Sequence, residues 1–468
     1  MQSLLFFIVF ILSCIPMFIK GVQDNFFLLL IHILIAGISS LSLFMYRKNS
    51  FSIYKIIHLF FLFFLCIAPI SQYKFDVSFW GAKKFSDIEY IYISFVVLCI
   101  LLLYNLIYYI VYKNSKCSLV NKLYKKISNP IVVSKKLRKK EFFYFVCLDV
   151  VILFLILYTY KFNLFYLFIR GGVTDTESLL DIQLTSLPQS VTLIIGNFFR
   201  PMAAIILLVA YKLKANKIML LVLGIFTLII AFPTSMPRFS AAAMYIPIFL
   251  SFSKTLRRPN IFVFSFVLGL LIIFPFLNNF RYLTSNTNIE FGLDFEMFLE
   301  GHFDSYAMFG HVLTENVITY GNQLLGTLFF WVPRSIWPSK AIGSGAFLAD
   351  KFNLELSNIS CCFFGEGYIN FGFVGILIFT VFIAWFSASF DKIYWNSQRL
   401  STNDNAFLEL IYFTLLGLLF FMMRGDLMSS FSFTLGYICS ILFLYYFLFY
   451  RRKYTFYIIK QTNEGFTD

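Results

Sequence analysis

Charged residues are scarce in this chain, because Asp, Glu, Lys and Arg together make up only 13% of its 468 residues. Hydrophobic residues make up 59%, and 64 residues are phenylalanine. A soluble protein of this size would need far more polar surface, and apolar runs of about 20 residues have the length that a bilayer requires. The composition excludes a soluble protein and predicts an integral membrane protein.

The sequence also lacks the motifs of several enzyme classes. It has no P-loop, no dinucleotide-binding glycine pattern and no zinc-ligand pair, so we expect neither a metal nor a cofactor. Its eight cysteines are scattered, and we interpret the vicinal pair Cys361 and Cys362 as packing rather than redox chemistry. The net charge of +14 does not indicate nucleic acid, because most of the excess lies in loops between apolar runs.

Long apolar runs are what the sequence has in abundance. We recognise twelve candidate spans, at 3–19, 26–45, 53–71, 89–112, 142–159, 190–211, 218–232, 240–253, 261–279, 366–389, 406–423 and 430–450. The first run has no basic segment before it and no cleavage site, so we expect it to remain as a helix. The prediction is an all-α, polytopic transmembrane fold with about 12 spans, forming one integral membrane domain over 1–468.

The basic residues predict the orientation. The loop 113–141 carries ten Lys and Arg residues, which places it in the cytoplasm. Counting alternate loops puts the other basic clusters and both termini on the same side. The opposite, periplasmic side then holds 280–365, the longest loop, and labelling of Cys361 or Cys362 from outside would support this orientation.

Within that loop, the segment 293–316 has a polar stripe. At 100° per residue, Glu300, Asp304 and His311 fall within about 40° of one another, whereas Phe303 and Phe309 occupy other faces. The pattern predicts a short amphipathic helix at the membrane surface. A helix whose polar side simply faces water fits the pattern as well.

Arginines on the outer side break the positive-inside rule. A charge near a span is costly unless it faces a cavity or a partner, and a guanidinium suits a phosphate or carboxylate. Such a gathering predicts a site for a lipid-linked phosphate or pyrophosphate. Two of the set, Arg170 and Arg424, also fit simple snorkelling to the interface. The outer arginines are Arg170, Arg200, Arg238, Arg281, Arg334 and Arg424.

Two motifs in the late part of the chain resemble those of the bacterial O-antigen polymerases, the oligosaccharide repeat-unit polymerases. They are PRSIWPSK at 333–340 and GEGYINFGFVG at 365–375. The layout of about 12 spans with one long periplasmic loop is similar too. Members of that family have been discussed in terms of an Arg separated by ten residues from a Gly, and Arg281 with Gly292 and Arg334 with Gly345 have this spacing.

The resemblance implies a metal-independent glycosyltransferase of the bacterial inner membrane. It would polymerise oligosaccharide repeat units carried on undecaprenyl pyrophosphate into O-antigen or a related polysaccharide at the periplasmic face. The implied partners are these lipid-linked oligosaccharides and membrane lipid, and binding of a chain-length regulator protein stays open. An O-antigen ligase and a lipid-linked oligosaccharide flippase are the alternative functions.

The implied reaction needs two kinds of residue. The leaving pyrophosphate needs cations, and we assign Arg200, Arg238, Arg281, Arg334 and Lys340 to that role. The acceptor hydroxyl needs a base, for which the candidates are Glu366, Asp304 and His311. The sequence does not choose among these three.

Overall fold

The structure is a computed structural model. It describes residues 2–19, 21–46, 49–114, 136–168, 191, 194–236, 238–273, 276, 296–356, 359–400 and 406–464. For residues 2–4, 114, 238–239, 398–400, 406 and 449–464, only the backbone is described. All regular secondary structure in the described residues is helical, which confirms the all-α prediction for this part of the chain.

Nine helical stretches of the described residues are long and apolar enough to cross a membrane. They comprise α2 (Phe26–Phe44), the continuous α3 (Ile53–Leu62), η1 (Phe63–Ile67) and α4 (Ala68–Lys74), α5 (Asp87–Asn114), α7 (Lys139–Thr159), η3 (Ile195–Phe199) with α9 (Arg200–Lys212), α10 (Lys217–Ile230), α17 (Phe363–Leu400), α18 (Ala406–Arg424) and α19 (Leu427–Glu464). Three shorter apolar helices lie at the other expected spans, namely α1 (Gln2–Phe18), α11 (Arg238–Phe252) and α12 (Ile261–Leu268). The chain is therefore a helical, multi-pass membrane protein.

The span made of α3, η1 and α4 lies at the centre of the larger core. It is predominantly apolar and buried on every face, as expected for a helix surrounded by other helices. It packs against α2, α17 and α18. Its first turn is capped by Asp391 of α17, whose carboxylate accepts hydrogen bonds from the backbone N–H of Ile53 (2.8 Å) and Tyr54 (3.1 Å). Asp391 thus ties the beginning of α3 to α17.

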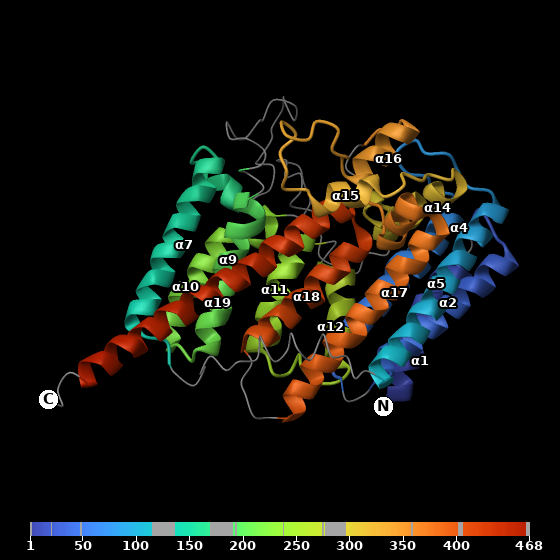
Figure 1. Ribbon diagram of the computed structural model, residues 1–468. Helices are drawn as coiled ribbons and strands as arrows, with labels where there is room; N and C mark the ends of the chain where they lie inside the picture. The colour runs from blue at the N-terminus through green and yellow to red at the C-terminus, as the bar shows by residue number, and fades with distance from the viewer. Residues whose placement is uncertain are drawn as a thin grey trace.

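The short helices of the 280–365 segment gather at one end of the helix bundle. These are α14 (Ser305–Thr314), α15 (Asn322–Leu328) and α16 (Ser344–Phe352). Both termini lie at the opposite end (Figure 1). This arrangement agrees with the expectation that the long loop and the termini lie on opposite sides. Most of the basic 113–141 loop, from 115 to 135, lies outside the described residues.

The expected amphipathic helix over 293–316 takes a different form. Residues 296–303 make two short 3-10 turns, η6 (Glu296–Leu299) and η7 (Gly301–Phe303), and the α-helix begins only at Ser305. Phe303 and Phe309 are fully buried, and Asp304 is 1% exposed. The apolar faces therefore contact protein, with the Phe303 ring centroid 4.6 Å from that of Phe64. A helix inside the protein replaces the predicted helix at the membrane surface.

The helix α17 is broken close to its beginning. Phe371 and Gly372 have non-helical backbone angles, and Gly372 has a φ of +62°, which favours glycine. Beside the break, Gly367 and Gly375 touch through their backbones, since a Cβ on Gly375 would lie 1.8 Å from the Gly367 carbonyl oxygen. The first two turns, which carry Glu366, are thereby set apart from the long part of the helix.

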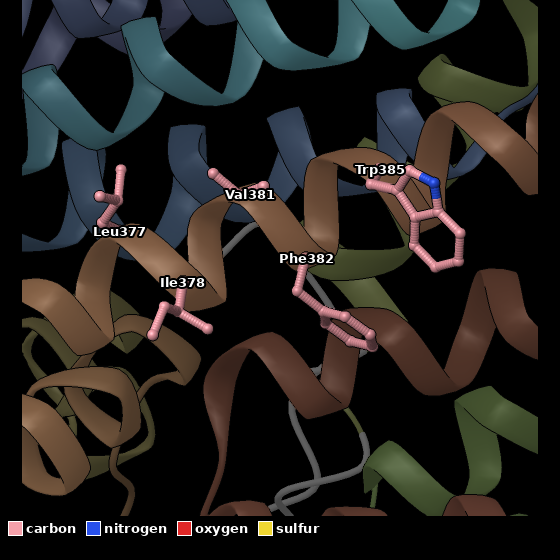
Figure 2. Close-up of a pocket in the computed structure, with 5 residues that line it drawn as sticks. All are labelled: Leu377, Ile378, Val381, Phe382 and Trp385. Carbon is pink, nitrogen blue, oxygen red and sulfur yellow. The ribbon is translucent and has the colours of Figure 1, made fainter. Parts of the chain in front are cut away.

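Beyond the break, α17 presents an apolar face. Leu377, Ile378 and Phe382 are about half exposed, and Val381 and Trp385 complete a shallow hollow around them (Figure 2). An apolar patch of this kind on the middle of a spanning helix suits the hydrocarbon of a bilayer rather than water.

Candidate functional site

The short turn between α18 and α19 is the meeting point of the candidate polar residues. Its sequence is RGDL, from Arg424 to Leu427. Asp304 pairs with its first residue, Arg424, and Glu366 accepts a hydrogen bond from its last residue, Leu427, although the two carboxylates are far apart in the chain. The site is therefore built from the beginnings of α14, α16, α17 and α19.

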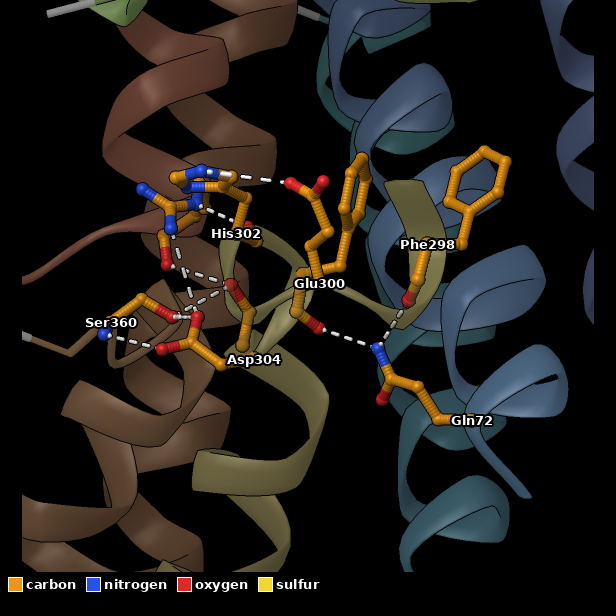
Figure 3. A network of polar contacts seen from close by, with 9 residues as sticks. Gln72, Phe298, Glu300, His302, Asp304 and Ser360 are labelled. Atoms are coloured by element: carbon orange, nitrogen blue, oxygen red, sulfur yellow. Dashed lines mark hydrogen bonds and ion pairs between the residues drawn. The ribbon is translucent and has the colours of Figure 1, made fainter. Parts of the chain in front are cut away.

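Asp304 is held by Ser360 and by Arg424 (Figure 3). Its carboxylate accepts hydrogen bonds from the Ser360 backbone N–H at 3.0 Å and from the Ser360 hydroxyl. The Arg424 guanidinium lies 3.7 Å from the same carboxylate, and its Nε donates to the His302 carbonyl at 2.9 Å. Arg424 therefore has a carboxylate partner inside the protein, and snorkelling alone does not describe it.

The nearby residues fix the turn that precedes α14. Gln72 of α4 donates from its side-chain amide to the carbonyls of Phe298 (2.9 Å) and Phe303 (3.0 Å), as Figure 3 shows. These bonds satisfy the carbonyls of two 3-10 turns that are buried against α4. The central span thus supports the segment that carries Asp304.

Glu366 is completely buried near the beginning of α17. One carboxylate oxygen accepts a hydrogen bond from the Ser344 hydroxyl at 2.7 Å. The other accepts from the backbone N–H of Leu427, the first residue of α19, at 2.9 Å. Because both oxygens have partners and no water-exposed surface, Glu366 joins α16, α17 and α19 together.

Asp426 is the carboxylate of this site that is only half-buried. Its Oδ1 accepts from the backbone N–H of Ser344 (3.0 Å) and Met428 (3.2 Å), and its Oδ2 accepts from the Ser429 hydroxyl (2.7 Å). Gly343 packs directly against it, since a Cβ on Gly343 would lie 2.4 Å from Oδ2. Asp426 therefore lies at the edge of the site, where a substrate could reach it.

The PRSIWPSK motif forms a loop that is held by its own cations. The exposed Arg334 donates to the carbonyls of Lys340 (2.8 Å) and Ala341 (3.4 Å). Lys340 donates to the carbonyls of Phe330 (2.9 Å) and Val332 (2.7 Å). Burial, together with the neighbouring Arg334, lowers the pKa of Lys340. The loop is thereby closed on itself while the Arg334 side chain remains accessible.

This loop leads directly into the site. Ala341 lies beside Gly326 of α15, and Met428 of α19 touches the same glycine. Gly345, eleven residues after Arg334, approaches the Ile359 carbonyl so closely that a Cβ would lie 2.2 Å from that oxygen. Glycine at 345 therefore has a packing reason, because the chain passes tightly against the segment before α17.

Arg200 is separate from this group of residues. It is 9% exposed, and it donates from Nε to the Ile230 carbonyl (2.9 Å) and from Nη2 to the Ser235 hydroxyl (2.6 Å). These bonds join the beginning of α9 to the end of α10. The backbone of Arg238 follows three residues after Ser235, and its side chain is not described. Arg281 and Arg170 lie outside the described residues.

His311 also lies apart from the RGDL turn. Its ring packs 4.4 Å from the Phe85 ring and 5.7 Å from the Phe352 ring, measured between centroids. Burial lowers the pKa of His311 to about 4, so the ring is neutral at pH 7. Of the three candidate bases, the structure therefore brings Asp304 and Glu366 to one turn and places His311 elsewhere on α14.

Ser344, Ser360 and Asp426 were missed by the sequence interpretation. Each of them contacts a partner that is distant in the chain. Only Asp426 could have been noticed in the sequence, because it is a charged residue two positions after Arg424. Among the described residues, no group of three His, Cys, Asp or Glu side chains could hold a metal ion.

No family model, no curated protein and no solved structure matches this chain. The function must therefore be argued from the residues themselves.

Proposed function

We propose that this chain is an oligosaccharide repeat-unit polymerase of the bacterial inner membrane. In this proposal it crosses the membrane twelve times, with both termini in the cytoplasm. It transfers a growing glycan from undecaprenyl pyrophosphate to the next lipid-linked repeat unit at the periplasmic face. The observation that carries the proposal is the joining of the two motif segments, because Ser344, which follows the Arg334 loop, donates to Glu366 of the GEGYINFGFVG motif.

The chemistry requires that a developing negative charge be stabilised. The acceptor oxygen forms a bond to the anomeric carbon while the bond from that carbon to the pyrophosphate oxygen breaks. The pyrophosphate leaves with the bonding electrons. An exposed guanidinium is suited to receive this charge, and Arg334 uses only part of its five N–H groups on the two carbonyls of its own loop.

The acceptor hydroxyl must also lose its proton. Glu366 and Asp304 are buried away from any substrate, so we assign them to positioning the loop and the RGDL turn. Asp426 is the more accessible carboxylate, and it lies against Gly343, two residues after the Ala341 carbonyl that Arg334 binds. Asp426 is therefore our choice for the base, and Arg334 for the pyrophosphate.

The test is the lipopolysaccharide ladder of cells in which variants replace the natural gene. Arg334→Ala removes a transition-state donor and Asp426→Asn removes the base, and each change costs at least about 100-fold in rate. Both variants should leave core that carries a single repeat, with normal amounts of protein in the membrane. Arg334→Lys should not restore long chains, because an ammonium lacks the planar fork.

The matched control is Lys351→Ala, which removes another exposed cation from α16 at the same end of the molecule. This variant should give a normal ladder. Normal ladders from Arg334→Ala and Asp426→Asn as well would contradict the assignment of both residues. A complete absence of attached glycan in the gene deletion would contradict the polymerase and leave the two alternatives. Polymer that accumulates on its lipid carrier would then indicate the ligase, and no such polymer would indicate the flippase.

One observation favours the flippase alternative. Asp149, in the middle of the spanning helix α7, is completely buried, and neither carboxylate oxygen has a hydrogen-bond partner among the described residues. An acidic residue within a span commonly marks an ion or substrate path. A flippase defect would remove even the single repeat from the ladder. That result, in the gene deletion and in Asp149→Asn, would replace the polymerase proposal.

A further inference from the structure

A small polar hollow lies between α14 and the loop that joins α4 to α5. Residues lining it include Asp76, Phe79, Lys83, Lys84, Phe85 and His311. It lies outside the contacts that hold Asp304 and Glu366. Its volume of about 20 Å³ is enough for one water molecule or one hydroxyl group, but not for a whole sugar ring.

The walls of this hollow are tightly packed. The backbone N–H of Glu355 donates to the Trp80 carbonyl at 3.1 Å, and the Trp80 ring lies directly against Gly301. On the other side, Gly310 allows Phe85 to approach α14, since a Cβ there would lie 2.7 Å from the Phe85 ring. The joining loop is therefore held against the 300–356 segment from two directions.

His311 gives the hollow its hydrogen-bonding group. The side chain is 6% exposed and lies between Phe85 and Phe352. Within the described part of the chain, its ring nitrogens make no hydrogen bond. Neither nitrogen is among the buried atoms that lack a partner, so both retain access to the hollow or to solvent. A neutral imidazole offers one donor and one acceptor there. A ligand with a hydroxyl group would satisfy it.

The charges around the hollow cancel. Lys84 forms an ion pair with Asp76, and Lys83 lies 3.7 Å from Glu89. Two cations paired with two carboxylates do not select an anion, whereas they can donate to and accept from hydroxyl groups. The aromatic rings of Phe79 and Phe85 provide an apolar wall beside these polar groups. This combination fits a hydroxyl or hydroxymethyl group at the edge of an uncharged sugar whose ring stays outside the hollow.

We propose that this hollow is a carbohydrate subsite, in which His311 hydrogen-bonds a hydroxyl or hydroxymethyl group of an uncharged sugar. The identity of the sugar's carrier rests on the proposed function, in which the sugar belongs to a lipid-linked repeat unit. His311 and Asp304 lie seven residues apart at the two ends of one helical stretch, or roughly 10 Å along α14. A short oligosaccharide can span that distance, so the subsite would hold a sugar unit away from the bond being formed.

The experiment measures binding of the repeat-unit oligosaccharide, released from its lipid by mild acid, to the full-length protein in detergent. Binding is followed by saturation-transfer NMR. His311→Phe keeps the aromatic packing but removes the hydrogen bonds, and it should weaken binding roughly 3- to 10-fold. His311→Gln keeps a donor and an acceptor and should retain most of the affinity. Unchanged unfolding midpoints in both variants would show that the fold is intact.

The outcomes separate this proposal from the proposed function. If His311→Phe binds the oligosaccharide as tightly as the wild type, the subsite is overturned even where Arg334→Ala abolishes the ladder. If His311→Phe loses binding while Arg334→Ala leaves a normal ladder, the subsite stands and the polymerase assignment falls. Equal loss in the Phe and Gln variants would identify a packing role for His311 and would also overturn the subsite.

Discussion

Burial of His311 has a consequence for stability that can be measured. The pKa of His311 is lowered from 6.5 to about 4 in the folded protein, so only the unfolded chain gains a proton between these two values. Folding stability should therefore fall as the pH is lowered through this window, by about 2 kcal/mol between pH 7 and pH 5. The measurement is the unfolding midpoint in detergent at both pH values.

The control for this prediction is His311→Gln, which cannot titrate. The loss of stability on acidification should be smaller in the variant than in the wild type by the stated amount. An identical pH dependence in the two proteins would show that His311 titrates normally. The other titratable groups near the hollow are common to both proteins, so their contribution cancels in the comparison.

At the scale of single residues, the sequence indicated some residues of the candidate site but not their hydrogen-bond partners. Asp304, Glu366 and Arg334 were identified because charges are scarce in this chain and stand out. Ser344 and Ser360 could not be found, because a serine is ordinary in a sequence and its role depends on a partner brought near by folding. The sequence also did not indicate that Arg200 donates to the Ile230 carbonyl and the Ser235 hydroxyl, and its binding to pyrophosphate stays a prediction.

At the scale of helices, the exact form of an element depends on its tertiary contacts, which hydrophobic periodicity does not reveal. The apolar runs correctly indicated the helices of the bundle, because a span must be long and apolar whatever its neighbours are. Periodicity was less informative for 293–316, since a polar stripe looks the same facing water or buried protein partners. Here Asp304 faces Ser360 and Arg424, and the first turns are 3-10 rather than α-helical.

The break in α17 leads to a prediction about glycine. Gly375→Ala would place a methyl group 1.8 Å from the Gly367 carbonyl, so the backbone at the break must move. Because Glu366 lies on the far side of this break, we expect loss of long chains in the ladder and a lower unfolding midpoint. The measurements are the ladder and the thermal unfolding of the purified protein.

Gly224→Ala is the matched control for that change. Gly224 lies within α10 with no atom close to the position of an added Cβ. Alanine there should be neutral or stabilising by up to about 1 kcal/mol, because alanine is the better helix former. If Gly375→Ala behaved like Gly224→Ala, the close contact between Gly367 and Gly375 would have no importance for the site.

At the scale of the whole molecule, the polar residues of the candidate site and the two termini lie at opposite ends of the helix bundle (Figure 1). The distribution of Lys and Arg predicts which end faces the cytoplasm. The native pair Cys361 and Cys362 cannot report this orientation as the sequence suggested. Both thiols are completely buried, and burial raises the pKa of Cys362 to about 12, so neither will react with a reagent in water.

Introduced cysteines provide the test of orientation. Lys351 on α16 and Lys217 at the beginning of α10 are both exposed, and the prediction places them on opposite sides of the membrane. A membrane-impermeant maleimide applied to cells with a permeable outer membrane should label Lys351→Cys and leave Lys217→Cys unlabelled. The unsubstituted protein should also stay unlabelled, because Cys117 lies in the loop predicted to be cytoplasmic. The exposed Cys99, Cys147 and Cys439 lie within the spanning helices α5, α7 and α19, where the lipid bilayer keeps the reagent away. Labelling of the second variant alone would place the candidate site in the cytoplasm, where the glycan transfer proposed for Arg334 and Asp426 could not occur.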